Sequence, residues 1–285
     1  MSFTTLISTT ALAGSLQAGW VIADCRFDLQ SEQWGRDAYL AAHVPSAVYV
    51  SLATDLSAPL TGSNGRHPMP PRDVMAATFQ RLGIDAHVQV VAYDQDNGMF
   101  ASRFWWMLKF AGHDEVAVLD GGFAKWIAEG RPTSAGEETR TPASFVPDWQ
   151  SHLLVDADAV KAGLAQPGTL LLDARAPERF EGRTEPLDRI AGHIPGAVNH
   201  FFKSNLAGDN TMLPPGQLRS RFHESLGGHT PAQTVIYCGS GVTACQNLLA
   251  MEHAGLPGAR LYAGSWSEWS SDPQRPVETG PARRR

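Results

Sequence analysis

Short runs of consecutive apolar residues alternate with helical patterns along the whole chain. In the first half, this pattern predicts strands at Val21–Cys25, Val48–Val50, Val88–Tyr93 and Val116–Leu119. It also predicts helices at Pro71–Gly83, which has a proline at its start and a glycine at its end, and at Met99–Gly112. Continuous apolar strands that alternate with helices are typical of an α/β fold, a parallel sheet with helices on both faces. Such sheets bind ligands beyond the carboxyl ends of their strands.

The same pattern occurs twice, in the same order. Four pairs of segments correspond: Asp24–Asp28 with Asp173–Pro177, Ala42–Val48 with Gly192–Val198, Val90–Asp94 with Thr234–Cys238, and Ala111–Trp126 with Ala254–Trp269. Their offsets lie between 143 and 150 residues, which indicates a duplicated domain. We therefore predict tandem domains at residues 1–130 and 153–285. Residues 131–152 contain three prolines and little apolar periodicity, so we interpret them as a linker.

Composition and charge narrow the function classes. The chain has 285 residues and a net charge of −6, which argues against nucleic acid as a partner because phosphate binding needs a concentrated basic face. The only cationic run is Arg283–Arg285, at the end of the sequence. The sequence contains no apolar run of the roughly 20 residues that a membrane helix needs, so no membrane partner is expected. No Lys or Arg precedes Arg26, which makes the N-terminus a poor signal peptide, and we predict a cytoplasmic protein.

Three cysteines raise the question of which thiol is reactive. Cys25, Cys238 and Cys245 are too few for a disulfide framework, and the absence of a C-x-x-C pair argues against a zinc site. Cys238 follows the predicted strand Thr234–Tyr237 and precedes the predicted helix Val242–Ala254, in a glycine-flanked loop that the other two cysteines lack. It therefore lies at the carboxyl edge of a sheet, where chemistry is common in this architecture.

The glycines around Cys238 allow the loop to bind an anion. Gly239 and Gly241 allow backbone N–H groups to turn toward one point and form an anion-binding turn, to which the N-terminus of the next helix adds positive charge. This arrangement would stabilise a thiolate and an anion attached to its sulfur. We expect Cys25 and Cys245 to be core residues. Cys245 lies about 10 Å along the helix from Cys238, too far for a disulfide.

The loop CGSGVTA, the terminal GSWSEW and the tandem arrangement resemble the two-domain rhodanese sulfurtransferases, and among them the 3-mercaptopyruvate sulfurtransferase branch. The resemblance covers residues 19–278. It implies two rhodanese-like domains and an enzyme whose cysteine, here Cys238, takes a sulfane sulfur from 3-mercaptopyruvate as a persulfide. The acceptor is then cyanide, a small thiol or a protein thiol such as that of a thioredoxin-like protein. No cofactor or metal is implied.

The resemblance also assigns candidate substrate-binding residues. The loop residues are Gly239, Gly241, Val242 and Thr243. Arg179 matches the family's substrate arginine and Arg189 matches the second one, with Arg183 as an alternative. Arginine suits a carboxylate-bearing donor because its fork binds both carboxylate oxygens. Arg175 directly follows a predicted strand, and we expect it to form a structural ion pair.

A proton relay is the remaining catalytic element that the resemblance implies. The stretch GRDAYLAAHVPSA maps the family's aspartate and histidine onto Asp37 and His43. With Ser240 they would carry the proton of the donor's thiol. The segment His67–Pro70 is a further candidate to border the site.

The first half offers an internal contrast, because Asp94 occupies the position of Cys238. A carboxylate cannot carry a sulfane sulfur, so the first domain is expected to be catalytically silent. Three other readings compete. Phosphatases of this loop type need an arginine six positions after the cysteine, where this chain has Ala244. A thiosulfate sulfurtransferase would share the fold and the nucleophile, and a non-enzymatic sulfur carrier or binding module would lack turnover with small donors.

Overall fold

The computed structural model describes residues 2–164 and 168–282, so the arginine run at residues 283–285 lies outside the described residues. The chain folds into two compact units. The first consists of residues 1–58, 70–150 and 208–212, and the second of residues 59–69, 151–207 and 213–285. The short segment Pro59–Met69, which interrupts the first unit in sequence, therefore packs with the second.

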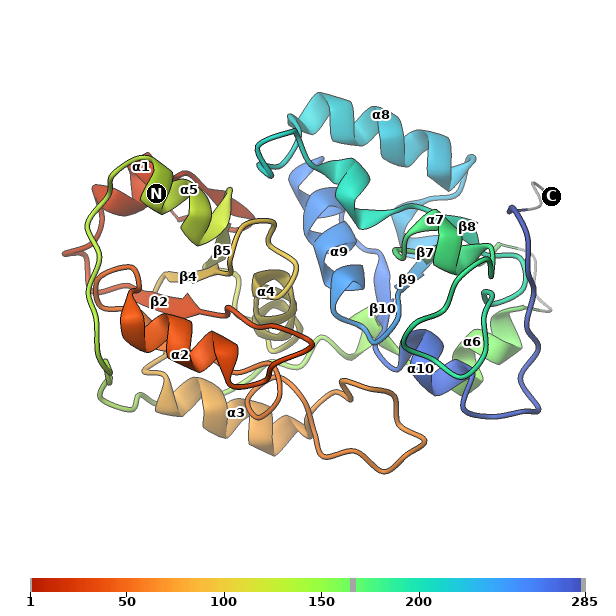
Figure 1. The fold of residues 1–285 in the computed structure, drawn as a ribbon, viewed down its shortest axis with the longest axis horizontal. Coiled ribbons are helices and arrows are strands. Elements are labelled where there is room, and N and C mark those ends of the chain that lie inside the picture. Colours follow the sequence, from red (N-terminus) through yellow and green to blue (C-terminus); the bar gives the residue numbers. More distant parts are fainter. Residues whose placement is uncertain (1, 165–167, 283–285) are drawn as a thin grey trace. The chain divides into compact units, whose positions relative to one another are not determined.

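The first unit contains a five-stranded parallel sheet with the strand order β1-β5-β4-β2-β3. The strands are β1 (Leu6–Ile7), β2 (Val21–Asp24), β3 (Val48–Tyr49), β4 (Val90–Tyr93) and β5 (Val116–Leu119). The helices are α1 (Thr9–Ala13), α2 (Trp34–Ala41), α3 (Arg72–Arg81), α4 (Ala101–Phe110) and α5 (Gly122–Ala128). Figure 1 shows these helices on both sides of the sheet.

The second unit repeats this architecture in the order β6-β10-β9-β7-β8. Its strands are β6 (Leu154–Val155), β7 (Leu170–Asp173), β8 (Val198–Asn199), β9 (Thr234–Tyr237) and β10 (Arg260–Tyr262). Its helices are α6 (Ala157–Gly163), α7 (Pro177–Phe180), α8 (Pro215–Leu226), α9 (Thr243–His253) and α10 (Ser265–Trp269). Three 3₁₀ turns lie at Ser151–Leu153, Phe202–Asn205 and Pro231–Gln233. The predicted α/β fold with two parallel sheets is confirmed.

Burial of both sheet faces explains the continuous apolar strands. All four residues of β4 are fully buried. Alternate side chains of a strand point to opposite faces, and Val91 and Tyr93 pack in one cluster with Trp126 of α5. Helix α4 packs against β4 and β5. In the second unit, Val235 and Tyr237 of β9 pack with tryptophans of α10 in the same way.

The duplication extends to individual hydrogen bonds. Tyr93 Oη accepts from the Val44 N–H at 3.2 Å, and Tyr237 Oη accepts from the Ile194 N–H at 3.1 Å. The corresponding tryptophans of α5 and α10 each donate from Nε1 to a proline carbonyl at 2.8 Å. The prediction of a duplicated domain is therefore confirmed at the level of side-chain geometry.

Two features of the fold were not predicted. The edge strands β1 and β6 have two residues each, which is too short for a hydrophobic pattern. Residues 131–150 of the predicted linker pack along the first unit, where Ser134 exchanges two backbone hydrogen bonds of 2.9 Å with His43 and Phe145 is buried. Across the part of the chain that the structure describes, no helix combines the length and apolarity that membrane spanning requires.

Candidate active site

Cys238 follows directly after β9 and is held there from both sides of its peptide unit. Its N–H donates to Ser265 Oγ at 3.1 Å, and its carbonyl accepts from the Trp266 N–H at 3.0 Å. Both partners belong to α10. The end of β9 is thus fixed against the first turn of this helix, and the cysteine side chain is only 2% exposed.

The loop after Cys238 brings a backbone donor to its sulfur. The N–H of Gly241 donates to Cys238 Sγ at 3.2 Å. Gly241 has a φ of +76°, and a Cβ atom there would lie 2.3 Å from the carbonyl oxygen of Ala263. Glycine is therefore required both by backbone conformation and by space. The chain then enters α9 through Val242, which is buried, and Thr243, the first helical residue.

Cys25 and Cys245 are core residues, as predicted. Cys25 is 1% exposed, and burial together with the neighbouring carboxylates of Asp24 and Asp94 raises the pKa of its thiol. Cys245 is fully buried, and its Sγ donates to the Gly241 carbonyl at 3.3 Å. Cys25 directly follows β2, but its Sγ lies 3.9 Å from the Ala23 carbonyl oxygen, and Cys245 lies within α9.

Ser240 is paired with His67. The distance between Ser240 Oγ and His67 Nδ1 is 2.7 Å. His67 belongs to the segment Pro59–Met69, which packs with the second unit, and Ser240 is 7% exposed. A neutral imidazole that carries its proton on Nε2 accepts the serine proton at Nδ1. The pair can therefore move a proton two residues away from the reactive sulfur.

The structure pairs Ser240 with His67 and gives His43 and Asp37, the other members of the predicted relay, different surroundings. His43 is fully buried, its ring stacks on Tyr39 at 4.4 Å, and its Nδ1 lies 2.8 Å from the Tyr39 carbonyl. Asp37 is exposed and accepts a hydrogen bond from Gln33. His43 follows the end of α2 and binds a carbonyl of the last turn, which has no partner within the helix.

The second copy of the domain supports this correction. His193, the counterpart of His43, stacks on Phe180 at 3.8 Å and places Nδ1 2.7 Å from the Phe180 carbonyl. A histidine that terminates a helix in both copies has a structural role.

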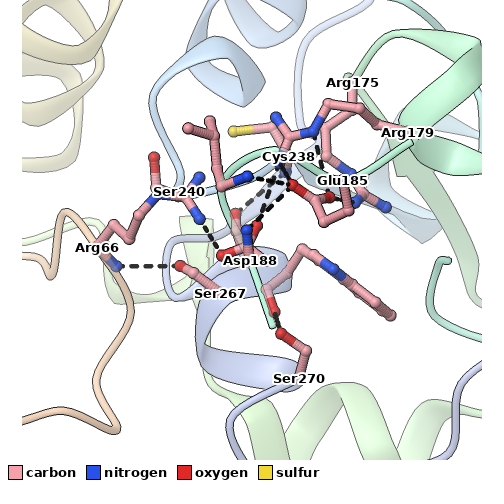
Figure 2. A network of polar contacts seen from close by, with 12 residues as sticks. Arg66, Arg175, Arg179, Glu185, Asp188, Cys238, Ser240, Ser267 and Ser270 are labelled. Atoms are coloured by element: carbon pink, nitrogen blue, oxygen red, sulfur yellow. Dashed lines mark hydrogen bonds and ion pairs between the residues drawn. The ribbon is translucent and has the colours of Figure 1, made fainter. Parts of the chain in front are cut away.

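Two guanidinium groups lie beside the loop (Figure 2). Arg179 of α7 donates to Glu185 from Nε and Nη2 at 3.2 and 2.7 Å, and to Asp188 from Nη2 at 3.1 Å. Arg66, which neighbours His67, pairs with the other oxygen of Asp188 through Nη1. The structure thus brings Arg179 to the cysteine loop together with Arg66, which sequence reasoning missed.

The other arginines of the Arg175–Arg189 segment have different surroundings. Arg175 is buried and makes a bidentate ion pair with Asp173, as predicted. Arg183 is exposed and pairs with Glu181. Arg189 is exposed as well, and it makes no hydrogen bond or ion pair with any residue that the structure describes.

Within residues 2–164 and 168–282, no cluster of His, Cys, Asp and Glu side chains could hold a metal ion. The cysteine loop with its serine–histidine pair and its two guanidinium groups is the candidate active site.

Comparisons with known proteins identify the family of the chain. The family model of the rhodanese-like domain matches residues 8–129 and 156–272. A relative from Pseudomonas aeruginosa named "probable 3-mercaptopyruvate sulfurtransferase" is 47% identical over 98% of this chain and 100% of its own length. A relative from Mycobacterium tuberculosis named "putative thiosulfate sulfurtransferase" is 41% identical over 97% of this chain and 98% of its own length.

A solved structure extends the comparison to the backbone. The 3-mercaptopyruvate sulfurtransferase from Leishmania major superimposes with a TM-score of 0.83 at 30% identity, over 94% of this chain and 74% of that one. The chain therefore belongs to the rhodanese-like family and carries two rhodanese-like domains in tandem.

Proposed function

We propose that this protein is a sulfurtransferase that takes the sulfur of 3-mercaptopyruvate onto Cys238 and passes it to a thiol or to cyanide. The 47% identical relative carries the name of this activity over its whole length. The local support is the loop itself, where Gly241 donates to Cys238 Sγ at 3.2 Å. A donor in this position stabilises a thiolate before the reaction and a persulfide anion after it.

In the first half-reaction, the thiolate of Cys238 attacks the sulfur of mercaptopyruvate. A sulfur–sulfur bond forms and the bond between that sulfur and C3 of the donor breaks. The electron pair of the broken bond goes to C3 and gives the enolate of pyruvate. C3 then takes up a proton, and the sulfur gives up the proton of its thiol.

The Ser240–His67 pair is the observation that favours mercaptopyruvate as the donor. A thiol proton must leave as the sulfur is transferred, and a proton must reach C3 of the enolate. Ser240 Oγ and His67 Nδ1, at 2.7 Å, can take the first and return it as the second. Thiosulfate has no thiol proton, so its reaction would not need proton transfer by Ser240 and His67.

In the second half-reaction, the acceptor attacks the outer sulfur of the persulfide. The sulfur–sulfur bond breaks and Cys238 leaves as a thiolate, which the Gly241 N–H again stabilises. Cyanide and small thiols can act in this way, and we propose the thiol of a thioredoxin-like protein as a further acceptor. The cytoplasmic location remains a prediction.

Thiosulfate is the second candidate donor, because two guanidinium groups next to Gly239 could also hold a sulfonate group. The 41% identical relative is named for thiosulfate. The decisive experiment compares kcat/KM for mercaptopyruvate and for thiosulfate with cyanide as the acceptor. We expect the higher value for mercaptopyruvate. A higher value for thiosulfate would overturn the donor assignment, and a single turnover with either donor would identify a sulfur carrier instead of an enzyme.

A further inference from the structure

Arg66 has no role in the reaction as described so far, yet it is anchored at the reactive loop. Its backbone N–H donates to Ser267 Oγ of α10 at 3.0 Å. The preceding residue, Gly65, approaches the same helix so closely that a Cβ atom would lie 2.8 Å from the carbonyl of Gly264. Two consecutive residues of the segment Pro59–Met69 are thus fixed against the helix that also holds Cys238.

The guanidinium group of Arg66 explains why residue 239 is a glycine. Gly239 does not have a positive φ, so its backbone conformation does not demand glycine. A Cβ atom on Gly239 would, however, lie 2.8 Å from Arg66 Nη2 and 3.5 Å from both Nη atoms of Arg179. Two positive groups therefore converge on the residue next to the nucleophile.

Hydrogen-bond accounting shows which donors remain for a ligand. Asp188 is 5% exposed at its side chain and binds both arginines, with Oδ1 on Arg66 and Oδ2 on Arg179. Glu185 occupies Nε and Nη2 of Arg179. Arg66 Nη2 and Arg179 Nη1 make no hydrogen bond among the described residues, and these are the groups close to Gly239. Asp188 and Glu185 thus orient the two guanidinium groups and leave the N–H groups of Arg66 Nη2 and Arg179 Nη1 available to a ligand.

We propose that Arg66 is the second arginine that binds the carboxylate of the sulfur donor, together with Arg179, and that Arg189 does not have this role. The two available N–H groups match the two oxygens of one carboxylate. The proposal rests on the proposed function for the identity of the donor. The anion site itself can be tested without turnover.

The test compares alkylation of Cys238 by iodoacetate and by iodoacetamide, followed by mass spectrometry of the peptide that contains Cys238. Both reagents need the same thiolate, so the ratio of their rates reports only what the carboxylate contributes. Loss of one charge-assisted hydrogen bond corresponds to about a ten- to a hundredfold change. We expect this ratio to fall about tenfold in Arg66→Leu and to fall less in Arg66→Lys, which keeps the charge and loses the fork.

Three further variants make the result specific. Arg221→Leu removes an exposed arginine of α8 that donates to the Ser204 carbonyl, and it should leave the ratio unchanged. Arg189→Leu should leave it unchanged as well. Gly239→Ala should lower the ratio, because its methyl group displaces the Arg66 side chain while the backbone keeps an ordinary φ. This variant also tests the site if Arg66→Leu fails to fold.

In turnover with mercaptopyruvate, Arg66→Leu should raise KM about ten- to a hundredfold and change kcat much less, because uniform binding of the donor is lost. A drop in the alkylation ratio for Arg189→Leu but not for Arg66→Leu would overturn the proposal, and so would an unchanged ratio in both Arg66→Leu and Gly239→Ala. If the wild-type protein does not turn over mercaptopyruvate but the ratio falls in Arg66→Leu, the anion site stands and the proposed donor does not.

Discussion

In the first unit the residue after the central strand β4 is Asp94, and in the second unit the residue after β9 is Cys238. Both residues make the same backbone hydrogen bond to the helix that follows the next strand. The Asp94 carbonyl accepts from the Phe123 N–H at 2.9 Å, and the Cys238 carbonyl accepts from the Trp266 N–H at 3.0 Å. The difference lies in what the loop N–H groups bind.

The carboxylate of Asp94 fills its own loop. Its Oδ2 accepts from the N–H groups of Phe100 and Ala101 at 2.7 and 3.2 Å, and its Oδ1 accepts from those of Gly98 and Asp96 at 2.9 and 3.3 Å. The N-terminus of α4 is thus satisfied from within the protein. In the first unit, the carboxylate of Asp94 occupies the N–H groups of the loop, which we call the closed loop. In the second unit, the sulfur of Cys238 takes the corresponding position, and we call this the open loop.

The largest effect should follow from removing the turn that distinguishes the Cys238 loop. In Gly241→Ala, the new Cβ atom would meet the Ala263 carbonyl oxygen and the φ of +76° would be strained, so the N–H can no longer face the sulfur. Loss of such a donor and a displaced nucleophile predict a fall in kcat/KM of about a thousandfold.

The matched control is Gly216→Ala on α8, where the added methyl group meets open space at an ordinary φ. Its kcat/KM should equal that of the wild-type protein, and its melting temperature should be equal or slightly higher, because alanine favours the helix. A Gly241→Ala variant with full activity would show that the turn does not matter for the reaction.

The corrected relay predicts the next largest effect. His67→Ala should lower kcat with mercaptopyruvate about a hundredfold, because Ser240 loses its proton acceptor. Iodoacetamide alkylation of Cys238 should be almost unchanged, since it needs no such proton transfer. His223→Ala, an exposed histidine of α8, serves as the control. His43→Ala should lower thermal stability and leave kcat of the folded enzyme unchanged, and the opposite pattern for the two histidines would restore the His43 relay.

The closed loop of the first unit can be opened. Asp94→Ala leaves the N–H groups of Gly98, Phe100 and Ala101 without their carboxylate, which should cost about 2–3 kcal/mol in the free energy of unfolding. Urea unfolding monitored by tryptophan fluorescence measures this loss. The folded Asp94→Ala variant should still form one persulfide per chain, because its opened loop has no thiol that could carry a sulfur. A second persulfide in this variant would contradict the silence of the first domain.

The charge of Asp94 predicts a smaller, pH-dependent effect. Burial raises the pKa of its carboxyl group to about 6, and the loop N–H groups only partly offset this. A group whose pKa is higher in the folded than in the unfolded chain stabilises the fold at low pH and loses that contribution as the pH rises through the folded value. The unfolding free energy of the wild-type protein relative to Asp94→Asn should therefore fall by about 2 kcal/mol between pH 4 and pH 7. A constant or rising difference would contradict the shifted pKa.

The fold could be predicted because its signals are local. Four consecutive buried positions in β4 and in β9 appear in the sequence as continuous apolar runs. The repeated segments indicate that the chain contains two copies of the same domain. The reactive cysteine could also be predicted from the sequence, because Gly241 and the helix that follows are its sequence neighbours. The predicted family membership is confirmed, and the predicted activity agrees with the name of the 47% identical relative.

The segment His67–Pro70 was predicted to border the site, but the role of His67 and the presence of Arg66 could not be predicted because their contacts are not local. His67 and Arg66 belong to a loop segment without apolar periodicity, and Ser240 lies 173 residues after His67. A loop of this kind gives no signal of the unit with which it packs. His43 was assigned instead because its stretch resembles a family segment that carries a histidine, but His43 and its counterpart His193 each bind a helix-terminal carbonyl in their own copy.

The central claim is that only the open loop carries sulfur, and intact-protein mass spectrometry after incubation with mercaptopyruvate tests it most directly. We expect a mass increase of one sulfur atom that maps to Cys238, persists in Cys25→Ser and Cys245→Ser, disappears on addition of cyanide, and is absent in Cys238→Ser. A persulfide that remains in Cys238→Ser would show that another residue carries the sulfur and would overturn this claim.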